Sequence, residues 1–256
     1  MIDLHTHLLP GIDDGPRTIE QSIALAAEMV AEGVTVAACT PHVRDDYGTT
    51  AQSMEAALAE LRSRLEQEGI ALDVRGGGEI ALDRLPALDP GTRARFGLAG
   101  NPRLLLLEFP FYGWPLALPS IVENLKAEGI VALFAHPERN SEVQEQPERL
   151  EPLVEQGAYV QLTAGSLDGT AGARAGRCAR ALLDAELAHV VASDRHGPSI
   201  ARTSLLAGRA AIGDEPLARW LTESAPKALL ESAPLPPRPA RQQPSRRPTR
   251  RLWRRG

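Results

Sequence analysis

Near its start the chain reads Ile2-Asp3-Leu4-His5-Thr6-His7, a short apolar segment that ends in two histidines. The segment predicts a β-strand. Because side chains two residues apart on a strand share a face, His5 and His7 can both reach one metal ion. Further along, runs rich in Val, Leu and Ile alternate with longer segments at helical spacing. Repeated alternation of this kind predicts parallel βαβ units.

The predicted elements repeat about seven times. Strands are expected at 2–5, 34–40, 71–74, 104–109, 130–135, 159–162 and 189–193, and helices at 18–32, 51–68, 116–128, 147–156 and 171–185. Seven repeats in one domain favour a closed or partly closed α/β barrel. An open doubly wound sheet is the alternative, but no G-x-G-x-x-G or P-loop follows a predicted strand, which weakens its nucleotide-binding form.

Composition is that of an ordinary soluble protein, with 43% hydrophobic and 24% charged residues among 256. No apolar run approaches the roughly 20 residues that span a bilayer, and no secretory signal is visible. Two cysteines, Cys39 and Cys178, are too few for a disulfide framework. We therefore expect a cytoplasmic protein.

The last part of the chain has a different composition. Residues 234–256 contain six prolines, eight arginines and no acidic residue, although the whole chain has a net charge of −5. Such a segment buries too little apolar surface to offset its chain entropy. We expect one barrel domain over 1–230 and a disordered basic tail over 231–256. Two interpretations of the tail stay open: contact with an acidic partner, anionic lipid or nucleic acid, or a solvated end.

Histidines and carboxylates gather where the predicted strands end. In a β/α barrel these carboxyl ends share one face, where active sites are built. Asp13 and Asp14 follow the first strand and are also compatible with a simple turn before Gly15. His189, at a strand start, is expected to be structural. The nine candidate ligands are His5, His7, Asp14, His42, Glu79, Glu108, His136, Asp194 and His196.

Imidazole nitrogens and carboxylate oxygens suit zinc, iron or manganese, and nine candidates exceed one tetrahedral site, so we expect two or three ions. Clustered divalent ions without sulfur ligands usually serve hydrolysis, including phosphoryl transfer. Phosphate also needs positive charge. Arg139, three residues past His136, is the first candidate for this role and Arg202 the second, with surface ion pairs as the alternative for both.

Longer motifs contain these residues. They are Leu9-Pro10-Gly11-Ile12-Asp13-Asp14-Gly15-Pro16 after the first strand, then Thr40-Pro41-His42, Gly78-Glu79, Leu107-Glu108-Phe109-Pro110, Ala135-His136-Pro137-Glu138-Arg139, Gln161-Leu162-Thr163-Ala164-Gly165-Ser166-Leu167 and Ser193-Asp194-Arg195-His196. In these motifs the chain resembles the PHP (polymerase and histidinol phosphatase) superfamily. More narrowly, it is similar to the bacterial tyrosine phosphatases of the CpsB/CapC type, from residue 1 to about 230.

The resemblance implies a distorted (β/α)7 barrel with a trinuclear site, usually described with manganese, and the same nine ligands. It implies that Arg139 binds the phosphate, with Arg202 as a possible partner. The implied substrate is phosphotyrosine on the tail of a bacterial tyrosine kinase that controls capsule or exopolysaccharide synthesis. Neither Cys39 nor Cys178 lies in the H-C-x-x-G-x-x-R type of loop that a thiol-dependent tyrosine phosphatase needs.

Two features depart from the family pattern. Arg195 and Gly197 stand where the family commonly has Ala and Asn, so Arg195 is expected either to crowd the mouth of the site or to add a phosphate contact. Arg202 lies six residues after His196 instead of about five. The alternative enzyme is a PHP phosphoesterase for a small molecule such as histidinol phosphate or a nucleotide. A non-catalytic binding module is the other alternative, which loss of ligands would favour; none is missing.

Overall fold

The computed structural model describes residues 1–197 and 203–240. Its strands, all paired in parallel, are β1 (Ile2–Thr6), β2 (Val36–Cys39), β3 (His42–Val43), β4 (Asp73–Gly76), β5 (Glu79–Ala81), β6 (Leu104–Glu108), β7 (Val131–Ala135), β8 (Tyr159–Thr163) and β9 (Val190–Ala192). The order is β1-β2-β4 in one sheet and β3-β5-β6-β7-β8-β9 in the other. Every predicted strand is present within a few residues of its predicted bounds.

The two sheets form one barrel with seven strand positions. β2 and β3 follow one another along one position, interrupted at Pro41, and β4 and β5 along the next, interrupted at Gly77 and Gly78. A hydrogen bond from the Glu79 N–H to the Pro41 carbonyl (3.1 Å) carries the pairing across the break. A Cβ on Gly78 would lie 2.8 Å from a side-chain carbon of Phe96, so a larger residue does not fit at this bend.

The barrel closes between its first and last strands. Thr6 forms a parallel bridge with Arg195, and the His7 N–H donates to the Arg195 carbonyl at 2.8 Å. The predicted α/β class with a distorted (β/α)7 barrel is therefore confirmed. The sequence analysis ended these two strands at residues 40 and 74 and did not predict β3 and β5, because Pro41 and the glycines separate these short pieces from the apolar runs before them.

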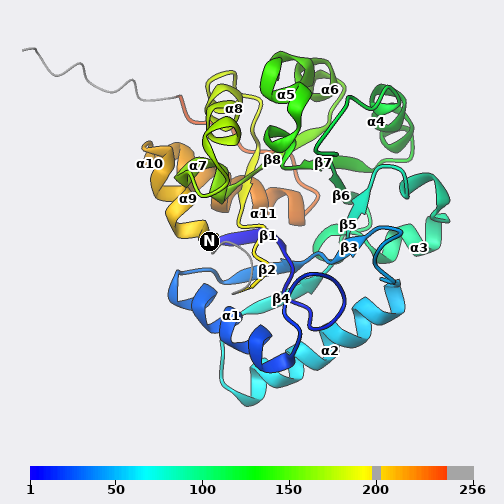
Figure 1. Ribbon diagram of the computed structural model, residues 1–256, viewed down its shortest axis with the longest axis vertical. Helices are drawn as coiled ribbons and strands as arrows, with labels where there is room; N and C mark the ends of the chain where they lie inside the picture. The colour runs from blue at the N-terminus through cyan, green and yellow to red at the C-terminus, as the bar shows by residue number, and fades with distance from the viewer. Residues whose placement is uncertain (198–202, 241–256) are drawn as a thin grey trace, which may run out of the picture.

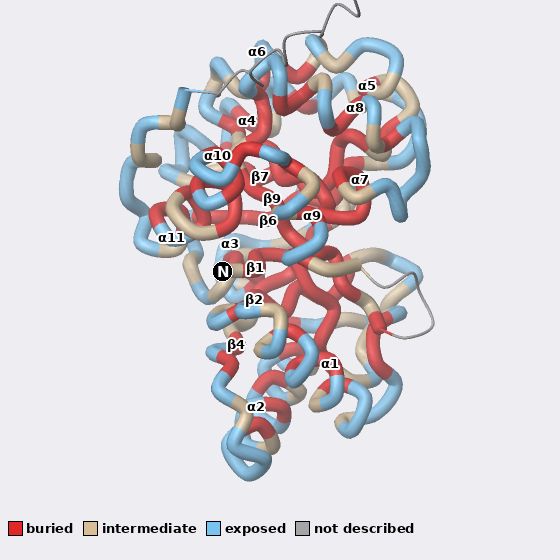
Figure 2. Tube along the Cα trace, turned by 90° about the vertical axis from the view of Figure 1, so that its left-hand side faces the viewer, coloured by how far each residue is buried: buried red, intermediate tan, exposed pale blue. Residues whose placement is uncertain are grey.

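Helices surround the strands, with α1 and α2 on one side and α4, α5, α6 and α8 on the opposite side (Figure 1). Their inward faces and the strands are buried, while their outer faces are exposed (Figure 2). The helices are α1 (Ile19–Ala31), α2 (Ala51–Gln67), α3 (Pro90–Arg95), α4 (Leu118–Ala127), α5 (Ser141–Glu145), α6 (Glu151–Glu155), α7 (Ala164–Asp168), α8 (Ala173–Asp184), α9 (Leu205–Ile212), α10 (Glu215–Arg219) and α11 (Ala225–Leu230).

The five predicted helices correspond to α1, α2, α4, α6 and α8. The sequence analysis did not predict α9–α11. Proline stands near the start of α10 and α11, and a π-helical turn, Trp220–Ser224, joins them. These interruptions break the helical period into pieces too short to recognise. Within the described residues, no helix is long and apolar enough to cross a membrane.

The first residues of the expected tail lie against the barrel. Leu235 packs on the hydrophobic core, and the Trp220 Nε1–H donates to the Pro236 carbonyl at 3.0 Å. The Arg238 guanidinium donates to the carbonyl of Ala188, just before β9, and stacks 5.2 Å from the Trp220 ring centroid. Pro236 and Arg238 thus have specific partners, one tryptophan and three backbone carbonyls, which composition alone did not indicate. Residues 241–256 lie outside the described part.

Candidate metal centre

The carboxyl ends of the strands surround one cavity of about 380 Å³. Six of the nine predicted ligands line it: Asp14, His42, Glu108, His136, Asp194 and His196. The other three, His5, His7 and Glu79, have no exposed surface and lie among them. The structure therefore brings together all nine side chains that the sequence analysis selected.

Glu79 lies at the centre of the group. Its Oε1 is 2.8 Å from His136 Nε2, and its Oε2 is 2.8 Å from His42 Nδ1. The same Oε2 is 3.4 Å from His5 Nε2 and 3.5 Å from His7 Nε2. One carboxylate thus faces four imidazoles, an arrangement in which it can bridge two ions.

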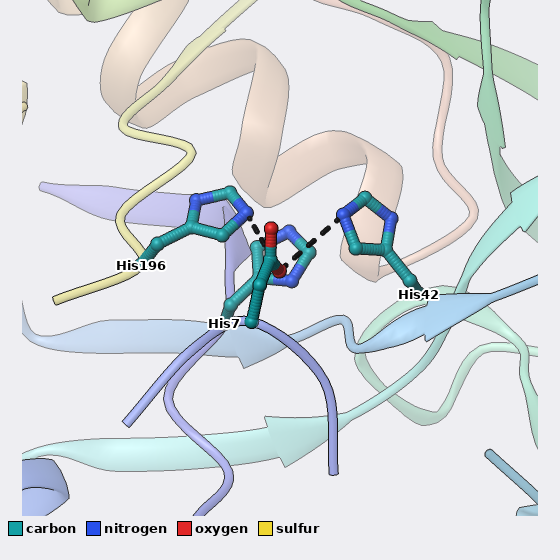
Figure 3. A group of neighbouring side chains, drawn as sticks. His7, His42 and His196 are labelled. Atoms are coloured by element: carbon teal, nitrogen blue, oxygen red, sulfur yellow. Dashed lines mark ion pairs between the residues drawn. The ribbon is translucent and has the colours of Figure 1, made fainter. Parts of the chain in front are cut away.

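A second carboxylate, Asp194, completes the inner group. Its Oδ1 lies 3.3 Å from His5 Nε2 and 3.5 Å from His7 Nε2. The outer group consists of His7, His42 and His196, whose rings converge on one carboxylate (Figure 3). That carboxylate is Asp14, whose Oδ1 is 3.3 Å from His196 Nε2 and 3.6 Å from His42 Nε2.

Several donor atoms lie close together around shared points, as the ligands of a cation do. His5 Nε2 and His7 Nε2 are 3.2 Å apart, so two imidazole nitrogens compete for one position. The buried His136 Nδ1 and Glu79 Oε2 have no hydrogen-bond partner among the described residues, although His42 Nδ1 is close to the latter. Four overlapping groups have donor atoms within 4.8 Å of one another. Nitrogen and oxygen donors in this number fit several divalent ions.

Neighbouring side chains orient the imidazoles. Asp13 Oδ2 lies 2.6 Å from His7 Nδ1, and Gln161 Oε1 lies 2.9 Å from His5 Nδ1. Each contact leaves the Nε2 of that histidine pointing into the group, as in metal sites where an outer carboxylate or amide fixes the ring. Asp13 also accepts from the Gly15 N–H at 3.0 Å, so Asp13 shapes the turn and orients His7, while Asp14 faces the cavity.

Electrostatics keeps the central carboxylates charged. Burial raises the pKa of Glu79, but the positive charges of His5 and His42 outweigh it and hold that pKa well below its usual range. The pKa of Asp194 is likewise lowered against its burial, chiefly by His5. Glu108 differs: burial, and then repulsion from Glu79, raises its pKa. Glu79 and Asp194 are therefore available as anionic oxygen ligands.

The backbone is unusual at two of these positions. His136 has φ 38° and Asp194 has φ 54°, in the left-handed region that non-glycine residues rarely adopt. His136 directly follows the last residue of β7, and Asp194 lies two residues after the end of β9, where the chain turns sharply. Such backbone strain concentrates at functional sites.

Arg139 lies at the edge of the cavity, in the turn that follows His136. One guanidinium nitrogen donates to Asp194 Oδ2 at 2.9 Å, and the guanidinium carbon is 4.7 Å from the Phe111 ring centroid. Arg139 therefore faces the same cavity as the histidines. Arg202, the second arginine predicted from the sequence, lies outside the described residues.

Arg195 does neither of the two things expected of it. It is 5% exposed, its Nε donates to the Thr203 carbonyl at 2.9 Å, and its other nitrogens pair with Glu28 and Glu32 of the α1 region. Its side chain thus points away from the mouth and ties the segment after β9 to the α1 region.

Three charged or aromatic residues of the cavity wall were missed in the sequence analysis. Arg44 donates to Glu108 Oε1 at 2.9 Å, Tyr47 stacks on His42 with centroids 5.3 Å apart, and Phe111 stacks on His136 at 6.0 Å. Arg44 and Tyr47 follow His42 closely in sequence, and Phe111 follows Glu108. Only this proximity to a predicted ligand could have indicated them.

Comparisons with known proteins agree with this geometry. A tyrosine-protein phosphatase, YwqE of Bacillus subtilis, is 36% identical over 197 residues, which is 77% of each chain. A putative tyrosine-protein phosphatase, CapC of Staphylococcus aureus, is 32% identical over the same shares. A solved structure from work on YwqE of Bacillus subtilis and CpsB of Streptococcus pneumoniae, described as unique metal-dependent tyrosine phosphatases, has a TM-score of 0.85 and 33% identity. That match covers 94% of this chain and 100% of the other.

A family model described as "Capsular polysaccharide synthesis, CpsB/CapC" matches residues 1–215, which include all nine candidate ligands and Arg139. With the barrel, the histidine and carboxylate cluster and these relatives in agreement, the chain belongs to the CpsB/CapC family.

Proposed function

We propose that this protein is a metal-dependent protein-tyrosine phosphatase that hydrolyses phosphotyrosine on other proteins. The observation that carries the proposal is the convergence of nine histidine and carboxylate side chains on one cavity, with Arg139 at its edge. The names of the relatives supply the reaction class.

We further propose that the nine side chains hold two or three ions, with manganese first and iron or zinc as alternatives. Four residues, His5, His7, His42 and Glu79, each belong to two of the four donor groups, which supports neighbouring ions with common ligands. Divalent ions bound there supply positive charge that polarises a phosphoryl oxygen and lowers the pKa of a water. The proposed catalytic domain is residues 1–230, with 231–256 as a basic appendage.

The protein's own residues then have defined tasks. Arg139, oriented by Asp194 and by the Phe111 ring, binds the non-bridging phosphate oxygens with its remaining N–H groups. If Arg202 also faces the phosphate, it adds a second cation. The reaction does not use a thiolate, because burial raises the pKa of both Cys39 and Cys178 to about 12.

The proposed physiological substrate is a bacterial tyrosine kinase that regulates capsule or exopolysaccharide synthesis, in the cytoplasm. The family's description, capsular polysaccharide synthesis, supports this context. The basic tail is proposed to contact an acidic partner or anionic lipid, as its eight arginines favour.

Phosphate release from synthetic phosphopeptides tests the proposal. Metal-free protein is supplied with Mn²⁺ and given a tyrosine-phosphorylated peptide, with a serine-phosphorylated peptide of the same sequence as the control. We expect release from the phosphotyrosyl peptide alone, and its loss in His136→Ala. Release from histidinol phosphate or a nucleotide, with none from any phosphotyrosyl peptide, would favour a small-molecule phosphoesterase instead.

A further inference from the structure

A second cavity opens beside the candidate metal centre. Its volume is about 820 Å³, and it lies between the 81–86 turn after β5 and the 110–121 segment after β6. Three residues, Arg44, Glu108 and Phe111, line both cavities, so the two are adjacent. We call the second cavity the side groove. It is large enough for several amino-acid residues, whereas the metal centre accommodates little more than one side chain.

Phe111 forms the wall between the two. One face of its ring is stacked on His136, with an interplanar angle of 7°, and the Arg139 guanidinium lies over the ring. The side chain is still 38% exposed. A phosphate ester held at Arg139 therefore has an apolar surface beside it, on the way from the metal centre to the side groove. This surface suits the ring of a phosphotyrosine.

The side groove has an apolar floor and an acidic rim. Leu82, Pro86, Pro110 and Ile121 contribute apolar surface, and Tyr112 is 83% exposed. Four carboxylates but only one arginine line the groove: Asp45, Asp46, Asp83 and Glu108 against Arg44. Arg84 pairs with Asp45, and Arg44 pairs with both Asp46 and Glu108, so Asp83 is the groove carboxylate that forms no ion pair with another described residue. Positive charge on a bound polypeptide would be favoured here.

We propose that the side groove binds the polypeptide next to the phosphotyrosine and selects segments that carry lysine or arginine. The inference rests on the proposed function, since it assumes a phosphotyrosyl protein as substrate. Asp83 is the rim residue best suited to a test, because it belongs neither to the nine proposed ligands nor to the ion pairs of Arg44 and Arg84.

The test measures KM and turnover for three substrates with wild-type protein and with Asp83→Lys. The substrates are para-nitrophenyl phosphate, which fills only the metal centre, and two phosphotyrosyl peptides that differ in lysine or glutamate at the flanking positions. We expect wild-type protein to prefer the lysine peptide. Asp83→Lys should raise the KM for that peptide about fivefold, as reversal of one surface charge does, and leave para-nitrophenyl phosphate turnover unchanged.

Glu60→Lys is the matched control, because it makes the same charge change on an exposed position of α2, away from the side groove. It should leave all three substrates unaffected. An unchanged peptide preference in Asp83→Lys, or an equal loss with para-nitrophenyl phosphate, would overturn the groove proposal alone. Hydrolysis of para-nitrophenyl phosphate without hydrolysis of either peptide by wild-type protein would overturn the proposed function, and the groove proposal with it.

Discussion

Asn140 offers a sharp test of how the cavity wall is held in place. The side chain is 1% exposed and makes four hydrogen bonds. Its Oδ1 caps α5 by accepting from the N–H groups of Glu142 (2.8 Å) and Val143 (2.9 Å). Its Nδ2 donates to the carbonyls of Pro110 (2.7 Å) and Gly113 (2.8 Å). Asn140 therefore joins the turn that carries Arg139 to the loop that carries Phe111.

Replacement by alanine removes all four bonds. The lost cap costs about 1 kcal/mol, and the two carbonyls left without their donor cost about 1 kcal/mol each, so we expect a loss of about 3 kcal/mol in the free energy of unfolding. Asn140→Asp keeps the cap but places a carboxylate oxygen against the same two carbonyls. We expect it to be at least as destabilising as alanine, because the second carboxylate oxygen then lies against two carbonyl oxygens that repel it.

Urea unfolding followed by circular dichroism measures both changes, and kcat/KM with para-nitrophenyl phosphate reports on the displaced wall. Asn124→Ala, at an exposed position of α4, is the control and should stay within about 0.5 kcal/mol of wild type. The proposed link between the two loops is wrong if the free energy of unfolding of Asn140→Ala is within about 1 kcal/mol, the contribution of one hydrogen bond, of the wild-type value. It is also wrong if Asn140→Asp is as stable as wild type.

Three further predictions concern separate parts of the molecule. Arg139→Ala should lower kcat/KM for a phosphotyrosyl peptide by about 10²- to 10³-fold, and Arg139→Lys should have an intermediate value. A kcat/KM equal to wild type in both variants would exclude a phosphate contact. Burial, followed by the charge of Arg238, lowers the pKa of His189 from its ordinary 6.5 to about 4. Since the unfolded chain binds this proton more readily, up to about 3 kcal/mol of stability should be lost as the pH falls from 6.5 to 4. Arg238→Ala should raise the pKa of His189 in an NMR titration, and an unchanged value would refute the electrostatic contact. Gly208→Ala would place a Cβ 2.5 Å from that of Ala164, so calorimetry should show a loss of about 2 kcal/mol, and a stability equal to wild type would mean that α7 and α9 separate freely.

The parts of the site that the sequence predicted are those set by strand position. His5, Glu108, His136 and Asp194 each lie at or just after the end of a strand, and a parallel barrel gathers such ends on one face whatever the intervening helices do. The assignment of these side chains as ligands stays a prediction until an ion is measured.

Other parts depend on three-dimensional packing and have no local signal. Arg195 lies between two candidate ligands in sequence, yet its side chain points to α1, where it pairs with the carboxylates of Glu28 and Glu32. Arg44 reaches Glu108 across a separation of 64 residues, and Phe111 stacks on His136 from the neighbouring loop. The stretch around Pro236 resembled a disordered tail by composition, but Trp220 donates a hydrogen bond to it.

The central claim, a multi-ion phosphatase centre, is tested most directly by titrating Mn²⁺ into metal-free protein while bound manganese and hydrolysis of a phosphotyrosyl peptide are measured in the same samples. The account predicts two or three ions per chain, with hydrolysis appearing as they bind and both being lost in His5→Ala. Hydrolysis of the phosphotyrosyl peptide by protein without bound manganese would contradict it.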